Sequence, residues 1–215
     1  MNTVSRLLAL LVFVAVLLLI FLCFFQFPSM DDYVGSYLEK YYGLPGAIES
    51  YLTTGNGRYS TIPIFLAISS SPALMNNYPL LLLFFMGIAF ISFYLFVRVI
   101  GKHFFSDPGV KASIGITGLM LLVFLSSMPE VSSFFYWMAT SVTYLFPFCL
   151  FLLLLVGYSY VLRQNQKKKS GWLVLICLLT VVLAGSNEVM LFFSAAVPFL
   201  VAFIYFVSSK QIPKL

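Results

Sequence analysis

The sequence predicts an all-α membrane protein, a polytopic bundle of about six transmembrane helices. Two observations on composition carry this prediction: 61% of the 215 residues are hydrophobic, and only 9% are charged. The mean hydropathy of +1.02 excludes a soluble globular domain. The third observation is the length of the apolar runs, since a helix needs about 20 apolar residues to cross a bilayer.

The whole chain, residues 1–215, is interpreted as a single transmembrane domain. The first apolar run is predicted to be a retained signal anchor, because residues 24–28 offer no cleavage site with small side chains. The runs predicted to span the membrane are Leu7–Phe27, Pro79–Ile100, Ser113–Ser127, Val142–Leu162, Trp172–Ala184 and Val189–Val207.

Charge asymmetry predicts the orientation of the bundle. If the six runs alternate, ten of the twelve basic residues fall on one side, and six of the seven acidic residues fall on the other. The positive-inside rule then places both termini in the cytoplasm and the acids outside. The basic residues on the predicted inner side are Arg6, Arg98, Lys102, Lys111, Arg163, Lys167, Lys168, Lys169, Lys210 and Lys214.

The first outer loop, residues 28–78, is the longest polar segment and is predicted to contain short interfacial helices. Tyr33, Tyr37 and Tyr41 recur every four residues, which puts a tyrosine stripe on one helix face. The glycines and proline of residues 43–46 should break this helix, and a second short helix is expected at Ala47–Leu52. Ile62–Ile68 is apolar but too short to span, so we expect it to dip into the interface.

Two adjacent aspartates, Asp31 and Asp32, open this loop. Two neighbouring carboxylates can accept a proton from a hydroxyl, ligate a divalent cation such as Mg²⁺ or Mn²⁺, or cap a helix. A cap needs only one aspartate, whereas mutual repulsion between two would raise the proton affinity of one of them. The sequence leaves these three roles open.

Two further charges on the outer side are candidates for a site. Arg58 follows a Gly-Asn-Gly turn and can grip a phosphate with two hydrogen bonds, or pair with a nearby carboxylate such as Glu49. Glu188 follows an apolar run of only 13 residues, which is too short for the hydrocarbon core. Either the bilayer thins there, or the helix continues through the turn and Glu188 lies at membrane depth, where it would need a partner such as Arg58. We expect Arg58, Glu188 and one of the two aspartates to line one outward-opening cavity.

In its order of motifs, the chain resembles the GT-C-type integral-membrane glycosyltransferases, and most of all the bacterial multi-pass group similar to O-antigen glucosyltransferases. The first two motifs are Asp31-Asp32-Tyr33 at the start of the outer loop and Gly57-Arg58-Tyr59 near its end. Phe135-Tyr136-Trp137 and Gly185-Ser186-Asn187-Glu188 are similar to later signatures of that group. Members of the group usually have more spans and often a C-terminal outer domain, so the chain is expected to be a fragment or a reduced member.

The resemblance implies an enzyme of the bacterial cytoplasmic (inner) membrane. It would move a sugar from a polyprenyl-phosphate donor to a glycan or lipid acceptor of the cell envelope. Asp31 or Asp32 would be catalytic, and no nucleic-acid partner is expected. The residues expected to bind substrate are Arg58, Tyr59, Glu130, Tyr136, Trp137, Asn187 and Glu188.

Two functions of other classes remain open at this stage. A transporter or flippase for lipid-linked sugars would use Arg58 and Glu188 as pathway charges rather than an aspartate as a base. A non-catalytic subunit of a membrane assembly is the third possibility, favoured by the short length of the chain.

Overall fold

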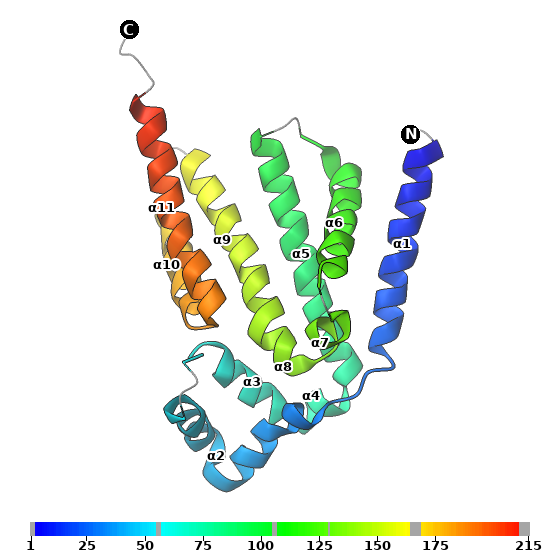
Figure 1. Ribbon diagram of the computed structural model, residues 1–215, viewed down its shortest axis with the longest axis vertical. Helices are drawn as coiled ribbons and strands as arrows, with labels where there is room; N and C mark the ends of the chain where they lie inside the picture. Colours follow the sequence, from blue (N-terminus) through cyan, green and yellow to red (C-terminus); the bar gives the residue numbers. More distant parts are fainter. Residues whose placement is uncertain (1–2, 55–56, 105–106, 129, 164–168, 211–215) are drawn as a thin grey trace.

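The computed structural model describes residues 3–54, 57–104, 107–128, 130–163 and 169–210, and every regular element among them is a helix (Figure 1). Long helices run alongside one another, and shorter helices gather beyond one end of them. The long helices are α1 (Thr3–Cys23), α5 (Tyr78–Phe104), α6 (Gly109–Ser126), α9 (Phe146–Arg163), α10 (Lys169–Ala184) and α11 (Glu188–Lys210). The remaining elements are η1 (Met30–Tyr33), α2 (Val34–Thr53, which a break at Gly43 divides into two short pieces), α3 (Thr61–Ser69), α4 (Pro72–Asn76), α7 (Val131–Phe135), α8 (Met138–Thr140) and the π-helical η2 (Ser141–Leu145).

Three stretches of helix in the described part of the chain are long and apolar enough to cross a membrane. They are Tyr78–Lys102, Gly109–Ser126 and Met138–Leu162, the last of which joins α8, η2 and α9. Three shorter apolar stretches accompany them: Leu10–Cys23, Ser170–Ala184 and Glu188–Phe203. The all-helical class is confirmed, whereas the number of six spans stays a prediction.

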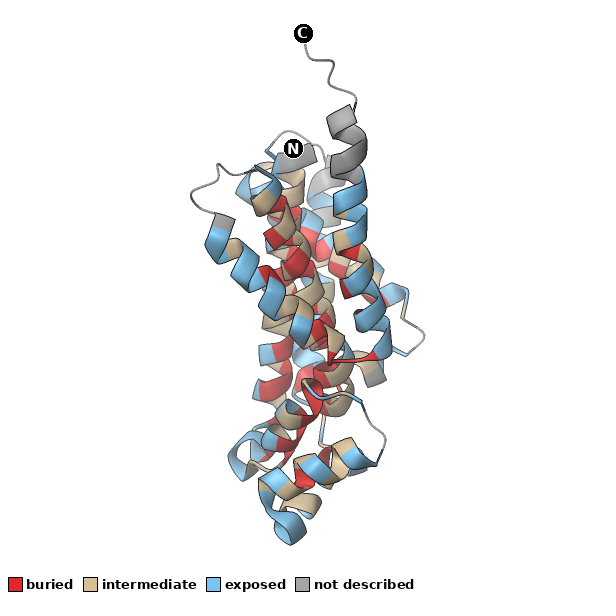
Figure 2. Ribbon diagram, turned by 90° about the vertical axis from the view of Figure 1, so that its left-hand side faces the viewer, coloured by how far each residue is buried: buried red, intermediate tan, exposed pale blue. Residues whose placement is uncertain are grey.

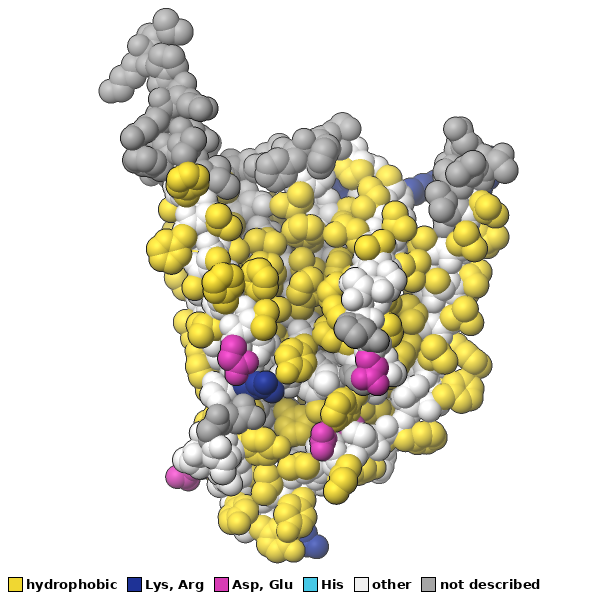
Figure 3. Space-filling view, viewed as in Figure 1, with side chains coloured by type: hydrophobic (Ala, Val, Ile, Leu, Met, Phe, Trp, Pro, Cys, Tyr) yellow, Lys and Arg dark blue, Asp and Glu magenta, His cyan; other side chains and the backbone are white. Residues whose placement is uncertain are grey.

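The two ends of the bundle differ in charge. Helix α1 begins and helix α11 ends at the same end (Figure 1), where the basic residues Arg6, Arg98, Lys102 and Lys111 also belong to helix ends. On the face seen in Figure 3, acidic side chains gather toward the opposite end, where the short helices lie. Lys167, Lys168 and Lys214 of the predicted inner side lie outside the described residues.

Helix α5 is the centre of the packing. It packs against α1, α6 and α9, while α9 packs against α10 and α10 against α11. Its buried residues Leu82, Phe85, Ala89 and Phe93 recur at helical spacing and form the face that enters the core. Figure 2 shows the buried residues following the middle of the bundle, with exposed residues on its outside. Apolar residues on the outer face of a helix are typical of a protein surrounded by lipid.

The break predicted in the first outer loop is confirmed at Gly43. Its φ of 67° lies in the left-handed region that glycine adopts without a steric cost. The helix resumes at once, earlier than predicted, because Pro45 falls in the first turn after the break, where its missing N–H costs nothing. Before the break, the exposed rings of Tyr37 and Tyr41 lie 4.9 Å apart and form part of the expected stripe.

Candidate functional site

A cavity of about 280 Å³ opens between the short helices and the bundle. On the face seen in Figure 3, the surface is hollowed between the lower end of the bundle and the helices beneath it. Residues of η1, α2, α3, the loop before α3, α8 and η2 build the cavity, so it unites segments from both halves of the sequence. Its lining residues are Asp31, Val34, Tyr51, Arg58, Thr61, Ile62, Phe65, Ala139 and Thr143.

Asp31 presents an exposed side chain to this cavity. Its carboxylate has no hydrogen bond or ion pair with any other side chain among the described residues. Burial and the negative charge of Asp31 together raise the pKa of Tyr51, which lines the same cavity. Asp31 therefore has the two properties that a general base needs, namely free lone pairs and access from an open space.

Asp32, the next residue, is in the opposite situation, because its exposed fraction is 0%. Its Oδ2 accepts the Tyr78 hydroxyl at 2.9 Å and the backbone N–H of Ser29 at 2.9 Å. Its Oδ1 accepts the backbone N–H of Ala139 at 3.1 Å. The bond to Ser29 closes a capping box at the start of η1, which is the helix-capping role that the sequence left open.

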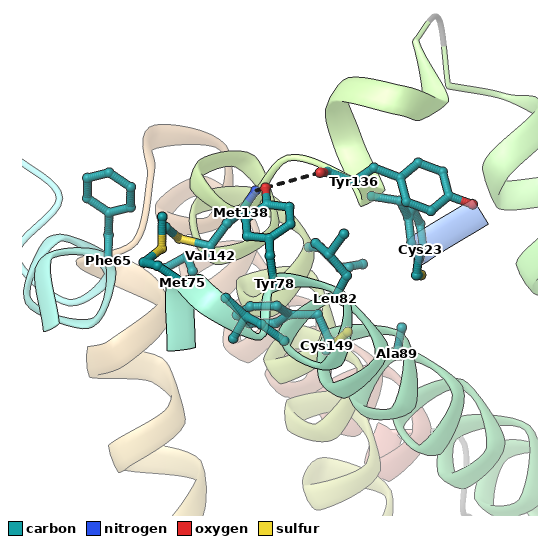
Figure 4. Close-up of a cluster of buried hydrophobic side chains, with 14 of the residues drawn as sticks. Cys23, Phe65, Met75, Tyr78, Leu82, Ala89, Tyr136, Met138, Val142 and Cys149 are labelled. Carbon is teal, nitrogen blue, oxygen red and sulfur yellow. Dashed lines mark hydrogen bonds between the residues drawn. The ribbon is translucent and has the colours of Figure 1, made fainter. Parts of the chain in front are cut away.

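Tyr78 extends this buried network into the core. Its hydroxyl oxygen accepts the N–H of Met138 at 2.9 Å and lies 3.2 Å from the carbonyl oxygen of Tyr136 (Figure 4). Asp32, Tyr78 and the backbone of residues 136–139 thus tie η1, α5 and the α7–α8 turn together. Burial raises the pKa of Asp32 above its ordinary value, although the hydrogen bonds that it accepts oppose the shift.

The two aspartates do not form a paired carboxylate site. The oxygens of Asp32 are occupied by donors from the protein, whereas Asp31 faces the cavity, so the pair does not fit a shared Mg²⁺ or Mn²⁺. No group of three or more His, Cys, Asp or Glu side chains suited to a metal ion occurs among the described residues.

Arg58 lies on the wall of the cavity, and its side chain is 28% exposed. Its guanidinium carbon stands 5.6 Å from the centre of the Tyr144 ring, and its Nη2 donates to the Tyr144 hydroxyl at 3.4 Å. The same nitrogen lies 4.0 Å from the Glu188 carboxylate. Its Nε is buried without a partner in the described residues, so the guanidinium retains donor capacity for an anion.

The residues after Arg58 dock onto the α10–α11 turn. The Tyr59 hydroxyl donates to the carbonyl of Val181 at 3.0 Å, and its ring covers Gly185 so closely that a Cβ there would lie 2.2 Å from a ring atom. The Ser60 N–H donates to the Gly185 carbonyl at 3.0 Å. The hydroxyl of Thr61 adds a bond of 3.2 Å to the carbonyl of Ser186. Two sequence motifs that are far apart in the chain therefore meet here, and their contacts hold Arg58 in place.

The expectation that Arg58, Glu188 and an aspartate line one cavity is met for Asp31 and Arg58 only. Glu188 begins α11, its side chain is 83% exposed, and it reaches Arg58 from outside the cavity lining. Helix α10 ends at Ala184. The alternative in which this helix continues through the turn and places Glu188 at membrane depth is therefore wrong. Glu188 is therefore an exposed partner of Arg58 and not a buried charge.

The remaining predicted substrate residues surround this end without lining the cavity. Asn187 is buried, donates to the Thr143 carbonyl at 2.8 Å and caps α11 through the Met190 N–H at 2.9 Å. Tyr136 is buried and donates to the carbonyl of Leu19 at 3.1 Å. Glu130 is exposed, and Trp137 is half-buried with no partner for its indole N–H among the described residues. Their roles in binding substrate stay predictions.

Sequence reasoning missed Tyr78, Tyr144 and Thr143. In the sequence, Tyr78 stands only at the end of a predicted loop, and Thr143 and Tyr144 stand at the start of a predicted span. Nothing local in the sequence marks them, since their partners are Asp32, Arg58 and Asn187, which are 44 or more residues away along the chain.

No family model, no curated protein and no solved structure matches this chain.

Proposed function

We propose that the protein is a multi-pass membrane glycosyltransferase of the GT-C type, which moves a sugar from a polyprenyl-phosphate donor to a glycan or lipid acceptor. The observation that carries this proposal is the shared cavity of Asp31 and Arg58 at the acidic end of an apolar helix bundle. A base and a cation in one cavity match the two charges that develop in glycosyl transfer from a phosphate.

In the proposed reaction, the Asp31 carboxylate accepts the proton of an acceptor hydroxyl. The hydroxyl oxygen attacks the anomeric carbon of the donor sugar, and the bond from that carbon to the phosphate oxygen breaks. Arg58 stabilises the negative charge that the departing polyprenyl phosphate gains. Asp32 is a positioning residue in this scheme, because its bonds to Ser29 and Ala139 fix the backbone that presents Asp31.

The proposal includes six spans with both termini in the cytoplasm, so that the cavity opens on the outer face of the cytoplasmic membrane. The alternating directions of the long helices and the contrast in charge between the two ends support this orientation (Figure 1). Helix α10 has 16 residues and reaches only about 24 Å, so the bilayer must thin beside it. Reporter fusions after Lys169 and after Thr54 should give internal and external signals respectively, and an external signal at Lys169 would refute the orientation.

The test of the activity is sugar transfer by the purified full chain in lipid nanodiscs, with radiolabelled polyprenyl-phosphate sugars as donors and envelope glycan or lipid as acceptor. Transfer that is lost in Asp31→Asn and kept in Glu49→Gln supports the proposal. Glu49 is a suitable control because it is an exposed carboxylate at the same end that does not line the cavity. Movement of labelled donor across the bilayer without transfer would indicate a flippase instead. If the protein neither transfers the sugar nor moves the donor, the result would indicate a non-catalytic subunit.

A further inference from the structure

A second and larger hollow lies between α1, α5 and α6. One part of about 690 Å³ is lined by the middle of α1 and the first half of α6, and a second part of about 430 Å³ continues toward α7. Val16 and Phe90 line both parts, so they form one groove, called the α1–α6 groove below. Its lining is apolar along its length except for Lys111 at one end.

The groove has the length of a single lipid chain. The lining residues of α6 run from Lys111 to Leu125, which is about 21 Å at 1.5 Å per residue. One leaflet contributes roughly half of a hydrocarbon core of about 30 Å, so a chain that starts at Lys111 fits inside the groove. Two lining glycines, Gly87 and Gly115, leave the groove wide, since a Cβ at either position would meet nothing within 4 Å.

The α1 wall approaches α6 closely at Gly118. A Cβ on Gly118 would lie 2.4 Å from the Val12 side chain, so the two helices touch where glycine permits it. The residues on either side of this contact do not close the space, and the outward face of α1 is exposed. The position of α1 against α6 therefore creates the groove, which stays open on both sides of the contact between Val12 and Gly118.

Charge at one end of the groove selects the headgroup. Lys111 is exposed in the first turn of α6 and has no ion pair among the described residues. The nearby carboxylate, Asp107, is already bound by Arg98 at 2.6 Å, and the hydrogen bond from the Gly109 N–H and the charge of Arg98 lower its pKa. Arg6 and Lys102 belong to the same end. This end is therefore complementary to an anion.

We propose that the α1–α6 groove binds one acyl chain of an anionic phospholipid, with the net negative charge of its headgroup at Lys111. The bound lipid fills the space that separates α1 from α5 and α6 and so stabilises the docking of the anchor helix. The site is at the opposite end of the bundle from the Asp31–Arg58 cavity, and the proposal does not depend on the transfer reaction.

The experiment is native mass spectrometry of the detergent-purified full chain, equilibrated with equal amounts of phosphatidylglycerol and phosphatidylethanolamine. We expect one phosphatidylglycerol to stay bound at collision energies that remove loosely attached lipid. Lys111→Gln should lower this preference about fivefold, the factor typical of one basic residue facing an anionic lipid. The substitution removes the charge at an exposed position, so it decides the headgroup assignment even if a larger variant fails to fold.

Gly115→Leu tests the chain site, because a leucine there fills the groove and also raises helix propensity. Gly171→Leu is the matched control: it places the same side chain at a glycine of α10 that also has nothing within 4 Å but does not line the groove. Loss of the retained lipid in Gly115→Leu alone supports the proposal. Equal retention in the two variants, or equal retention of the two phospholipids by the unmodified chain, would overturn it.

Discussion

Two neighbouring regions at the acidic end of the molecule treat equivalent carboxylates in opposite ways. Asp32 is buried, and both oxygens of its carboxylate accept hydrogen bonds, from Ser29, Tyr78 and Ala139. The open cavity beside it leaves Asp31 exposed, and Arg58 lines the same cavity. The difference shows that a buried charge with satisfied hydrogen bonds builds the fold, whereas a charge without partners is available for chemistry.

The largest effect is expected for Asp31→Asn. An amide of the same size keeps the shape of the cavity but has no useful proton affinity, so transfer should fall by about 10²- to 10⁴-fold. The thermal unfolding temperature should not change, because the Asp31 side chain contacts no hydrogen-bond partner among the described residues. Transfer rates and unfolding of the same preparation check both statements. Near-normal transfer would remove Asp31 from the mechanism.

Asp32→Asn should act on stability instead. Whichever way the new amide is oriented, its NH₂ group faces a backbone donor, either the N–H of Ala139 or the N–H of Ser29 beside the Tyr78 hydroxyl. A stranded buried donor costs about 1–3 kcal/mol, which lowers the unfolding temperature by several degrees in a chain of this size. Tyr78→Phe removes one donor to Asp32 and also leaves the buried N–H of Met138 without its acceptor, so we expect a cost in the same range. An Asp32→Asn variant that unfolds like wild type would contradict the structural role.

The docking of the Arg58 loop can be loosened through Gly185→Ala. The added Cβ would lie 2.2 Å from the Tyr59 ring, so the ring must move. Because Tyr59 is itself exposed and can shift, we expect a cost of about 1–2 kcal/mol, in the lower part of the range for overpacking. Gly171→Ala, where the Cβ meets nothing within 4 Å, is the control and should be neutral or slightly stabilising. Equal unfolding temperatures for the two variants would contradict the stabilising contact between Tyr59 and Gly185.

The smallest effect is expected for Glu188→Gln. Its carboxylate is 83% exposed and 4.0 Å from Arg58, and exposed ion pairs of this kind contribute about 0–1 kcal/mol. Transfer should change by no more than a few-fold, because Glu188 does not line the cavity. Steady-state kinetics of this variant beside Asp31→Asn would sharpen the contrast between the two acids. A loss as large as that of Asp31→Asn would return Glu188 to the reacting centre.

The elements of the fold follow closely from local properties of the sequence. The apolar runs predicted the long helices, and the glycine at residue 43 predicted the break in α2, because both depend on residues that are close together in the chain. The motifs that contain Arg58 and Gly185 were also identified as candidates. Their direct contact, however, depends on how α3 packs beside the α10–α11 turn, which no local pattern encodes.

The division of labour between the two aspartates could not be derived in the same way. Both residues are acidic and adjacent, so the sequence leaves either as the base. The distinction comes from Tyr78 and from the backbone of Ala139, which lie 46 and 107 residues away along the chain. The exposure of Glu188 was likewise missed, since the short run before it suggested burial.

The different roles of Asp31 and Asp32 are tested most directly by carboxyl modification of the folded wild-type chain with a water-soluble carbodiimide and a small polar amine. Fragmentation between residues 31 and 32 assigns each adduct to one aspartate. We expect an adduct on Asp31, loss of transfer in proportion to it, and protection by a polyprenyl-phosphate sugar, with Asp32 unmodified until the protein unfolds. Modification of Asp32 in the folded chain at the rate of Asp31, or full modification of Asp31 with transfer intact, would contradict it.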